Sequence, residues 1–250
     1  ASDLPWAVGA ASTMSKVFRD EPFAGPAAAR VEIALARHET EGVQLVVVAQ
    51  QQELRDVAVT LSELRGASHV IPASDVAWHL VGYVETKGER PYWTDKVGFW
   101  PDPLLPPQRF SVAKGAAQPV WLNVTAAPDT PPGLYCGTVT LAPANAPPWR
   151  VELSVRVWNF TLPRTGHLKT MCWMDPQPLL HFYGLAGVED PGAVALVKRF
   201  AELSLRNRLG PGGTLGCGFS WAKPQWPVRK TAAGYDFAQA ADLLRFGFDR

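Results

Sequence analysis

Residues 149–163, WRVELSVRVWNFTLP, decide how the chain is organised, because they end one kind of sequence and begin another. Val151, Leu153, Val155 and Val157 alternate with polar residues. This period of two predicts a β-strand with one apolar face. The strand is expected to stop before Pro163, since proline cannot donate a hydrogen bond to a sheet. We therefore expect two domains, residues 1–163 and residues 164–250.

The chain before this boundary has the pattern of an antiparallel β-sandwich. Short alternating apolar runs recur between turns rich in proline and glycine, as is typical of that fold. The clearest runs lie at residues 30–36, 43–49, 57–61, 78–84, 120–124 and 135–141. Residues 38–42 and 88–107 are predicted to be a turn and a long loop, and no sustained helical period precedes residue 190.

After the boundary the pattern becomes that of a parallel βα array. An apolar strand is predicted at residues 167–173, followed by a helix with Asp190 as N-cap and Pro191 in its first turn. A short glycine-rich segment at residues 208–215 precedes a second helix, which Asp236 is expected to cap. The fold class is thus a multi-domain one: a β-sandwich followed by the start of a (β/α)8 barrel of the TIM type.

Two βα units cannot close a barrel, which needs eight. The chain is therefore expected to be part of something longer, with the remainder of the barrel coming from the same polypeptide or from another chain. The apolar positions of the two helices should face those neighbours. They are Val194, Val197, Leu205, Phe237, Leu244 and Phe248.

Composition excludes several classes of protein. The chain is 47% hydrophobic with a formal net charge of +1 and no basic run, which argues for a packed core and against a nucleic-acid partner. No apolar run reaches the ~20 residues of a membrane span. The first residues, Ala-Ser-Asp, fit removal of a signal peptide or trimming of a tag, so a secreted or periplasmic location is expected, with the cytoplasm left open.

The three cysteines and five histidines show no metal-ligand spacing, so neither a cofactor nor a metal is expected. The segment from Gly218 to Ala222 nearly fits G-x-S-x-G, but Pro224 and Pro227 follow where that motif needs a helix. The adjacent carboxylates Asp20 and Glu21 lie in a turn of the sandwich and are explained by turn chemistry.

Candidate substrate-binding residues lie where barrel enzymes place them, after the carboxyl ends of strands. Trp173 and Asp175 follow the first predicted barrel strand. The loop at residues 216–234 is longer than a usual βα connection and carries Trp221, Lys223 and Trp226. These side chains either contact a sugar or pack against the sandwich, and the sequence leaves both open.

Four stretches together resemble glycoside hydrolase family 123, including the domain type known as DUF4091. They are ARHETEGVQLVV at residues 36–47, FWPDPLLP at 99–106, QPVWL at 118–122 with PGLYCGTVT at 132–140, and VWNFTLP at 157–163. His38 stands where the family usually has asparagine. The resemblance covers nearly the whole chain.

This resemblance implies a β-sandwich followed by a (β/α)8 barrel with β-N-acetylgalactosaminidase activity. In the family the substrate's acetamido oxygen attacks the anomeric carbon, an aspartate orients it, and the adjacent glutamate is the general acid and then the base. That pair lies near the end of the fourth barrel strand, so it is expected beyond residue 250 and the catalytic residues are unknown. The expected partner is a glycan or glycoside substrate. The alternative is a non-catalytic carbohydrate-binding or structural sandwich protein, or a relative that cleaves another sugar.

Overall fold

The computed structural model describes residues 4–88, 96–168, 170, 176–186, 190–210 and 228–248. The chain divides into two compact units, Ala1–Leu162 and Pro163–Arg250. Within the described part, no helix has the length and apolar character needed to cross a membrane.

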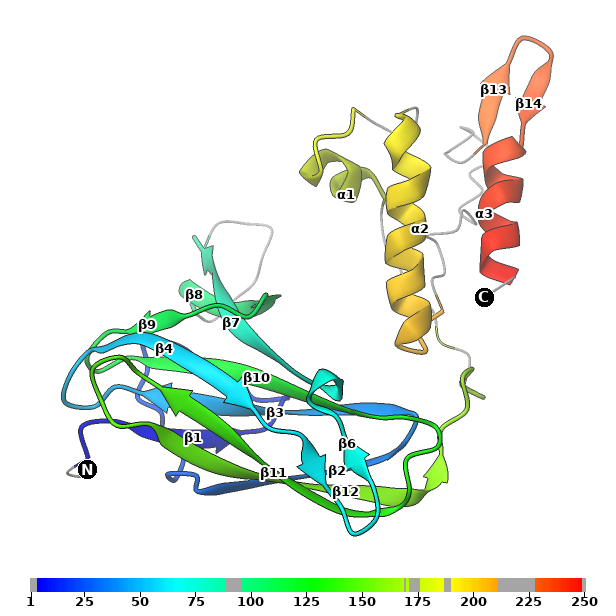
Figure 1. Cartoon of the computed structure of the whole chain (residues 1–250). Helices are drawn as coiled ribbons and strands as arrows, with labels where there is room; N and C mark the ends of the chain where they lie inside the picture. The colour runs from blue at the N-terminus through cyan, green and yellow to red at the C-terminus, as the bar shows by residue number, and fades with distance from the viewer. Residues whose placement is uncertain are drawn as a thin grey trace. The chain divides into compact units, whose positions relative to one another are not determined.

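The first unit is a sandwich of two sheets, which Figure 1 shows as stacked layers. One sheet has the order β1-β3-β10-β7-β8. Its strands are β1 (Ala7–Ala11), β3 (Glu39–Val48), β10 (Ala117–Ala126), β7 (Val76–Thr86) and β8 (Gly98–Leu105). A short 3-10 turn, η1 (Ala73–Asp75), leads into β7. This sheet is antiparallel throughout.

The second sheet has the order β2-β12-β11-β4-β9 with two short strands beside it. Its strands are β2 (Arg30–Arg37), β12 (Trp149–Thr161), β11 (Gly133–Ala142), β4 (Leu54–Leu61), β9 (Phe110–Val112), β5 (Leu64–Arg65) and β6 (Val70–Ile71). The apolar face predicted for residues 149–163 is confirmed, since Val151, Leu153, Val155 and Val157 are all buried between the sheets. The β-sandwich is thus the fold of this unit.

One pairing corrects the prediction of a purely antiparallel sandwich. β12 pairs with β2 in parallel, with Glu152 opposite Arg30 and Val157 opposite Leu35. Alternation of apolar residues reports which face of a strand is buried and carries no information about strand direction. The prediction of direction was therefore wrong for this pair.

Two predicted connections are shorter than expected. The turn predicted at residues 38–42 is His38 alone, with a φ of 60°, and β3 begins at Glu39. A Glu39 carboxylate oxygen accepts from the Ala36 backbone N at 2.6 Å and fastens this turn. Residues 98–105 form β8 instead of a loop, because β8 is an edge strand, where prolines such as Pro101 and Pro103 are tolerated.

The second unit contains three helices and a short hairpin. They are α1 (Pro176–Phe182), α2 (Pro191–Arg206), β13 (Arg229–Thr231), β14 (Gly234–Asp236) and α3 (Ala238–Phe248). The predicted start of α2 is confirmed, since Asp190 is its N-cap and accepts from Gly192 N at 2.8 Å. Asp236 accepts from Ala238 N at 2.9 Å at the start of α3. The helix α1 and the hairpin were not predicted.

The strands expected for a barrel are not seen in the described residues. Of the predicted strand at residues 167–173, His167, Leu168 and Thr170 are described and none is in a strand. Of residues 208–215, the described ones (208–210) are not in a strand either, and the other positions of both segments lie outside the described residues. Among the helix positions expected to face neighbours, Val197 is buried, whereas Phe237 is 51% exposed. The side chains of Leu244 and Phe248 lie outside the described part.

Candidate functional site

The substrate-binding residues predicted from the sequence all lie outside the described residues. These are Trp173, Asp175, Trp221, Lys223 and Trp226. Their role stays a prediction. The polar cluster with the most charged and aromatic contacts that the structure describes is instead on the sandwich, around Asp20 and Glu21.

The segment that carries these carboxylates crosses the outer side of the first sheet. It follows β1 and is fastened by Gln44 of β3, which is only 2% exposed. The Gln44 amide nitrogen donates to the backbone oxygens of Ser12, at 2.7 Å, and Ser15, at 2.8 Å. A buried amide with both donors satisfied holds a loop in place, because leaving those donors unpaired would cost free energy.

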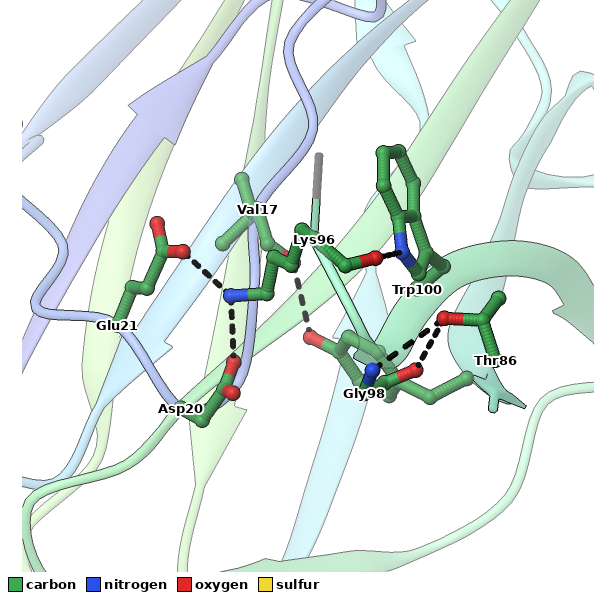
Figure 2. A network of polar contacts seen from close by, with 8 residues as sticks. Val17, Asp20, Glu21, Thr86, Lys96, Gly98 and Trp100 are labelled. Carbon is green, nitrogen blue, oxygen red and sulfur yellow. Dashed lines mark hydrogen bonds and ion pairs between the residues drawn. The ribbon is translucent and has the colours of Figure 1, made fainter. Parts of the chain in front are cut away.

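Lys96 pairs with both carboxylates. Figure 2 shows its ammonium between them, with Nζ 3.2 Å from Asp20 Oδ1 and in contact with Glu21 Oε1. Trp100 fixes the backbone of Lys96, since its indole N–H donates to the Lys96 carbonyl at 2.9 Å. Thr86 on β7 exchanges hydrogen bonds with the backbone of Gly98 and ties down the start of β8.

Aromatic rings lie against the cationic side chains of this cluster. Lys96 Nζ lies 4.0 Å from the centroid of Phe18, and Phe18 meets Trp100 edge to face with centroids 5.2 Å apart. The guanidinium of Arg19 lies 3.5 Å from the Phe99 ring centroid. The Tyr83 hydroxyl donates to the Val17 carbonyl at 3.1 Å, and burial of this phenol raises its pKa above the usual range.

The electrostatics of the cluster bear on whether Asp20 could act as a general acid. The hydrogen bond from Lys96 holds the pKa of Asp20 below its ordinary value, and a backbone hydrogen bond of Asp20 acts in the same direction. The hydrogen bond to Glu21 raises the pKa of Lys96. A glycosidase needs a general acid whose pKa is raised so that it carries a proton at neutral pH. Asp20 is pushed the opposite way and is therefore unsuited to donate a proton.

A hollow of about 370 Å³ adjoins this segment and is lined by Lys16, Phe18, Glu21 and Phe23 among others. Its acid Glu21 is already paired with Lys96. Among the described residues, no group of three His, Cys, Asp or Glu side chains is placed to hold a metal ion. The cluster joins the segment after β1 to the start of β8, and we refer to it as the brace.

Asp20 and Glu21 were expected to be explained by turn chemistry alone, and their pairing with Lys96 was not predicted. Lys96 lies 76 positions after Asp20 and 75 positions after Glu21 in the sequence. No local spacing could therefore predict this pairing. The aromatic residues at 99 and 100 were visible in the sequence, yet nothing in their pattern showed that they would shelter a lysine.

Comparison with known proteins shows what the sandwich is similar to. Residues 30–143 match the family model described as the glycoside hydrolase 123 N-terminal domain. The matched range begins with β2 and ends just after β11, so it covers most of the sandwich. The resemblance to glycoside hydrolase family 123 that the sequence predicted is thereby confirmed.

The fold is also similar to that of a family 123 glycoside hydrolase from Clostridium perfringens, studied for glycolipid glycan hydrolysis. The TM-score is 0.73 at 12% sequence identity, over 98% of this chain and 46% of that protein. The chain thus spans less than half the length of that enzyme. At this level of identity the similarity concerns the fold alone.

Two other solved structures are much less similar. A Bacteroides ovatus GH5 xyloglucanase bound to a heptasaccharide has a TM-score of 0.27 at 11% identity, over 58% of this chain and 19% of that one. The sporulation control protein Spo0M from Bacillus subtilis has a TM-score of 0.31 at 12% identity, over 64% of this chain and 51% of that one. No curated protein sequence matches the chain.

Proposed function

We propose that these 250 residues are the N-terminal part of a retaining glycoside hydrolase that acts on N-acetylhexosamine glycosides, in particular galactosaminides. The observation that carries this proposal is the match of residues 30–143 to the glycoside hydrolase 123 N-terminal domain. The fold similarity to a family 123 enzyme over 98% of the chain supports it.

In this proposal the second unit begins a (β/α)8 barrel, and the remaining strands come from the same polypeptide or from another chain. Coverage of only 46% of the Clostridium perfringens enzyme is consistent with that organisation. Trp173, Asp175, Trp221, Lys223 and Trp226 then lie at the carboxyl end of the barrel strands. That end is where barrel enzymes bind their substrates.

The proposed reaction uses the substrate's own acetamido group. Its carbonyl oxygen attacks the anomeric carbon as the glycosidic bond breaks, and a glutamic acid gives its proton to the leaving oxygen. An adjacent aspartate orients the acetamido group. Water, deprotonated by the same glutamate, then opens the cyclic intermediate with net retention. We expect this pair beyond residue 250, since the adjacent carboxylates Asp20 and Glu21 are paired with Lys96 on the sandwich.

The test is a rate comparison with the complete gene product. A nitrophenyl N-acetyl-β-galactosaminide should be cleaved, and the first sugar formed should have the β configuration by NMR. The matching nitrophenyl β-galactoside, which lacks the acetamido nucleophile, should be cleaved at least about a hundredfold more slowly, within the range that a positioned nucleophile supplies.

The chain offers a matched control. The double substitution Asp20→Asn with Glu21→Gln should leave the rate unchanged, because these carboxylates bind Lys96 on the sandwich. Loss of turnover in that variant while it remains folded would contradict the proposal. Binding of the galactosaminide without any cleavage would favour the alternative, a non-catalytic carbohydrate-binding protein.

A further inference from the structure

The outer face of the second sheet has a hollow of about 220 Å³ over β2, β12 and β11. The residues that line it include Arg30, Glu32, Leu134, Ser154, Arg156 and Trp158. Pockets for drug-sized ligands occupy about 300–1,000 Å³, so this hollow suits a smaller ligand with a single ring. It lies away from the brace around Lys96, which is on the other sheet.

Strand register builds this hollow. Arg156 of β12 lies opposite Ala34 of β2 and opposite Leu134 of β11. All three side chains point outward, because Val155 and Val157 on either side of Arg156 point into the core. Ala34 reaches only a short way above the sheet, so the space beside Arg156 stays open.

The polar groups along one side of the hollow are already oriented. The Arg30 guanidinium donates to Ser154 Oγ at 3.1 Å and pairs with Glu32 at 2.8 Å and Glu152 at 3.6 Å. Ser154 is buried beneath it. A guanidinium held on three sides presents its remaining donors in a fixed direction, which lowers the ordering cost of binding.

An aromatic residue, Trp158, lines the other side of the hollow. Trp158 is 47% exposed, and the Arg156 guanidinium carbon lies 5.7 Å from its ring centroid. Trp158 follows Val157, the last residue of β12 in regular register with both β11 and β2, so its indole lies at one end of the hollow. The indole and the donors of Arg156 and Arg30 therefore face the same small space.

We infer that this hollow binds one neutral sugar residue of a glycan, with the apolar face of the pyranose ring on Trp158 and its hydroxyl groups on Arg156, Arg30 and Glu32. The choice of a sugar rests on the proposed function. The geometry fits it independently, because a sugar ring combines a C–H face with hydroxyl groups that donate and accept.

Charge favours a neutral ligand. The two cations, Arg30 and Arg156, are balanced by two anions, Glu32 and Glu152. A hydroxyl-rich ring uses both kinds of partner, whereas a carboxylate would gain Arg156 and be repelled by the glutamates.

The test is an NMR titration of the ¹⁵N-labelled 250-residue chain with three probes of matched configuration. Methyl β-galactoside should shift the Trp158 indole resonance and the amides of β2 and β12. Galactitol, which has the hydroxyl groups without a ring, should bind at least about tenfold more weakly, since stacking is lost. Methyl β-galacturonide should bind no more tightly than the galactoside.

Two variants complete the test. Trp158→Ala should weaken galactoside binding about tenfold. Phe160→Ala is the matched control, because Phe160 is also an exposed aromatic residue of β12, at 55%, but does not line the hollow. It should bind the galactoside like the original chain.

The inference is overturned if the galactoside shifts no resonance of the hollow, if galactitol binds equally well, or if Phe160→Ala weakens binding as much as Trp158→Ala. Much tighter binding of the galacturonide would overturn the assignment of a neutral ligand. Because binding is measured without turnover, its failure is distinct from failure of the hydrolase assay on the complete gene product.

Discussion

In the residues that the structure describes, the two units hold apolar clusters of very different size. In the sandwich, residues from both sheets form one continuous core, and side chains such as Leu122, Leu141 and Leu153 are fully buried. The cluster in the second unit that the structure describes has three buried members, Leu180, Ala193 and Leu196. Leu203 of α2 and Phe237 before α3 stay more than half exposed.

This difference follows from geometry. A strand with period-two alternation buries its apolar face as soon as a second sheet covers it. An amphipathic helix needs a neighbour along its whole stripe. In the described residues of α2, Val197 and Ala201 are buried whereas Leu203 is exposed. The ion pair between Lys198 and Asp242, at 2.7 Å, links α2 to α3, and the Lys198 ammonium also lies 5.5 Å from the Phe246 ring centroid.

The largest expected effect comes from truncating one leucine in each unit to alanine. Leu153→Ala should lower the free energy of unfolding of the sandwich by about 2–5 kcal/mol, because the removed atoms are fully buried. Leu203→Ala on α2 should cost less than about 0.5 kcal/mol, since that side chain is 56% exposed. Urea unfolding measures both. Similar losses would show that the exposed helix face is covered in solution.

A smaller effect is expected from close backbone packing in the sandwich. A Cβ at Gly137 of β11 would lie 2.6 Å from Leu64 Cδ2 and 2.8 Å from the Glu63 carbonyl. Gly137→Ala should therefore destabilise the sandwich by about 1–3 kcal/mol, the usual cost of overpacking.

The control for this substitution lies in the second unit. A Cβ at Gly166 would lie 3.5 Å from the Leu168 carbonyl, an ordinary contact, so Gly166→Ala should be nearly neutral. The urea midpoints of Gly137→Ala and Gly166→Ala, each measured against the original chain, compare the two stability changes. An unchanged midpoint for Gly137→Ala would mean that β11 and the residues before β5 separate easily.

The faces of the strands could be predicted from sequence, whereas the partners of many strands could not. Alternation in β12 is local, so the burial of Val151 and Val155 followed directly from the pattern. Parallel pairing of β12 with β2 joins residues more than a hundred positions apart, and no local pattern encodes it. The prolines of β8 led to the prediction of a loop, since proline is unfavourable in a central strand. It is tolerated in an edge strand, and the local sequence does not show that β8 is one.

The same limit applies to the candidate sites. Neither the pairing of Lys96 with Asp20 nor the hollow beside Trp158 was predicted, because both depend on residues that only tertiary structure brings together. Capping, in contrast, is a local interaction. The Asp190-Pro191 pair therefore predicted the start of α2 correctly.

The helix caps offer a third test, confined to the second unit. Asp190→Ala removes the oxygen that accepts from Gly192 N at 2.8 Å and should destabilise α2 by about 1 kcal/mol. Asp190→Asn keeps an acceptor and should restore most of that loss. Hydrogen exchange of the α2 amides is the measurement, and the sandwich amides should not change. An effect that spread into the sandwich would show that the two units unfold together.

The smallest expected effect concerns the brace on the sandwich. Lys96→Met removes the group that lowers the pKa of Asp20, so that pKa should rise toward its ordinary value in a ¹³C titration of the side-chain carboxyl. Lys114→Met, an exposed lysine elsewhere on the sandwich, should leave it unchanged. High salt should reduce the difference in the Asp20 pKa between the original chain and Lys96→Met, because salt screens exposed charges.

The sign of the accompanying stability change follows from linkage. The pKa of Asp20 is lowered by folding, so its contribution is present above the unfolded-state pKa and is lost as pH falls through the folded value. The pKa of Lys96 is raised, so its contribution is present below the unfolded-state pKa and is lost as pH rises through the folded value. The Lys96→Met variant should therefore differ most from the original chain near neutral pH and converge with it at both extremes. A difference that persisted in strong acid would mean that Lys96 stabilises the sandwich through its contact with Phe18 and not through the two carboxylates.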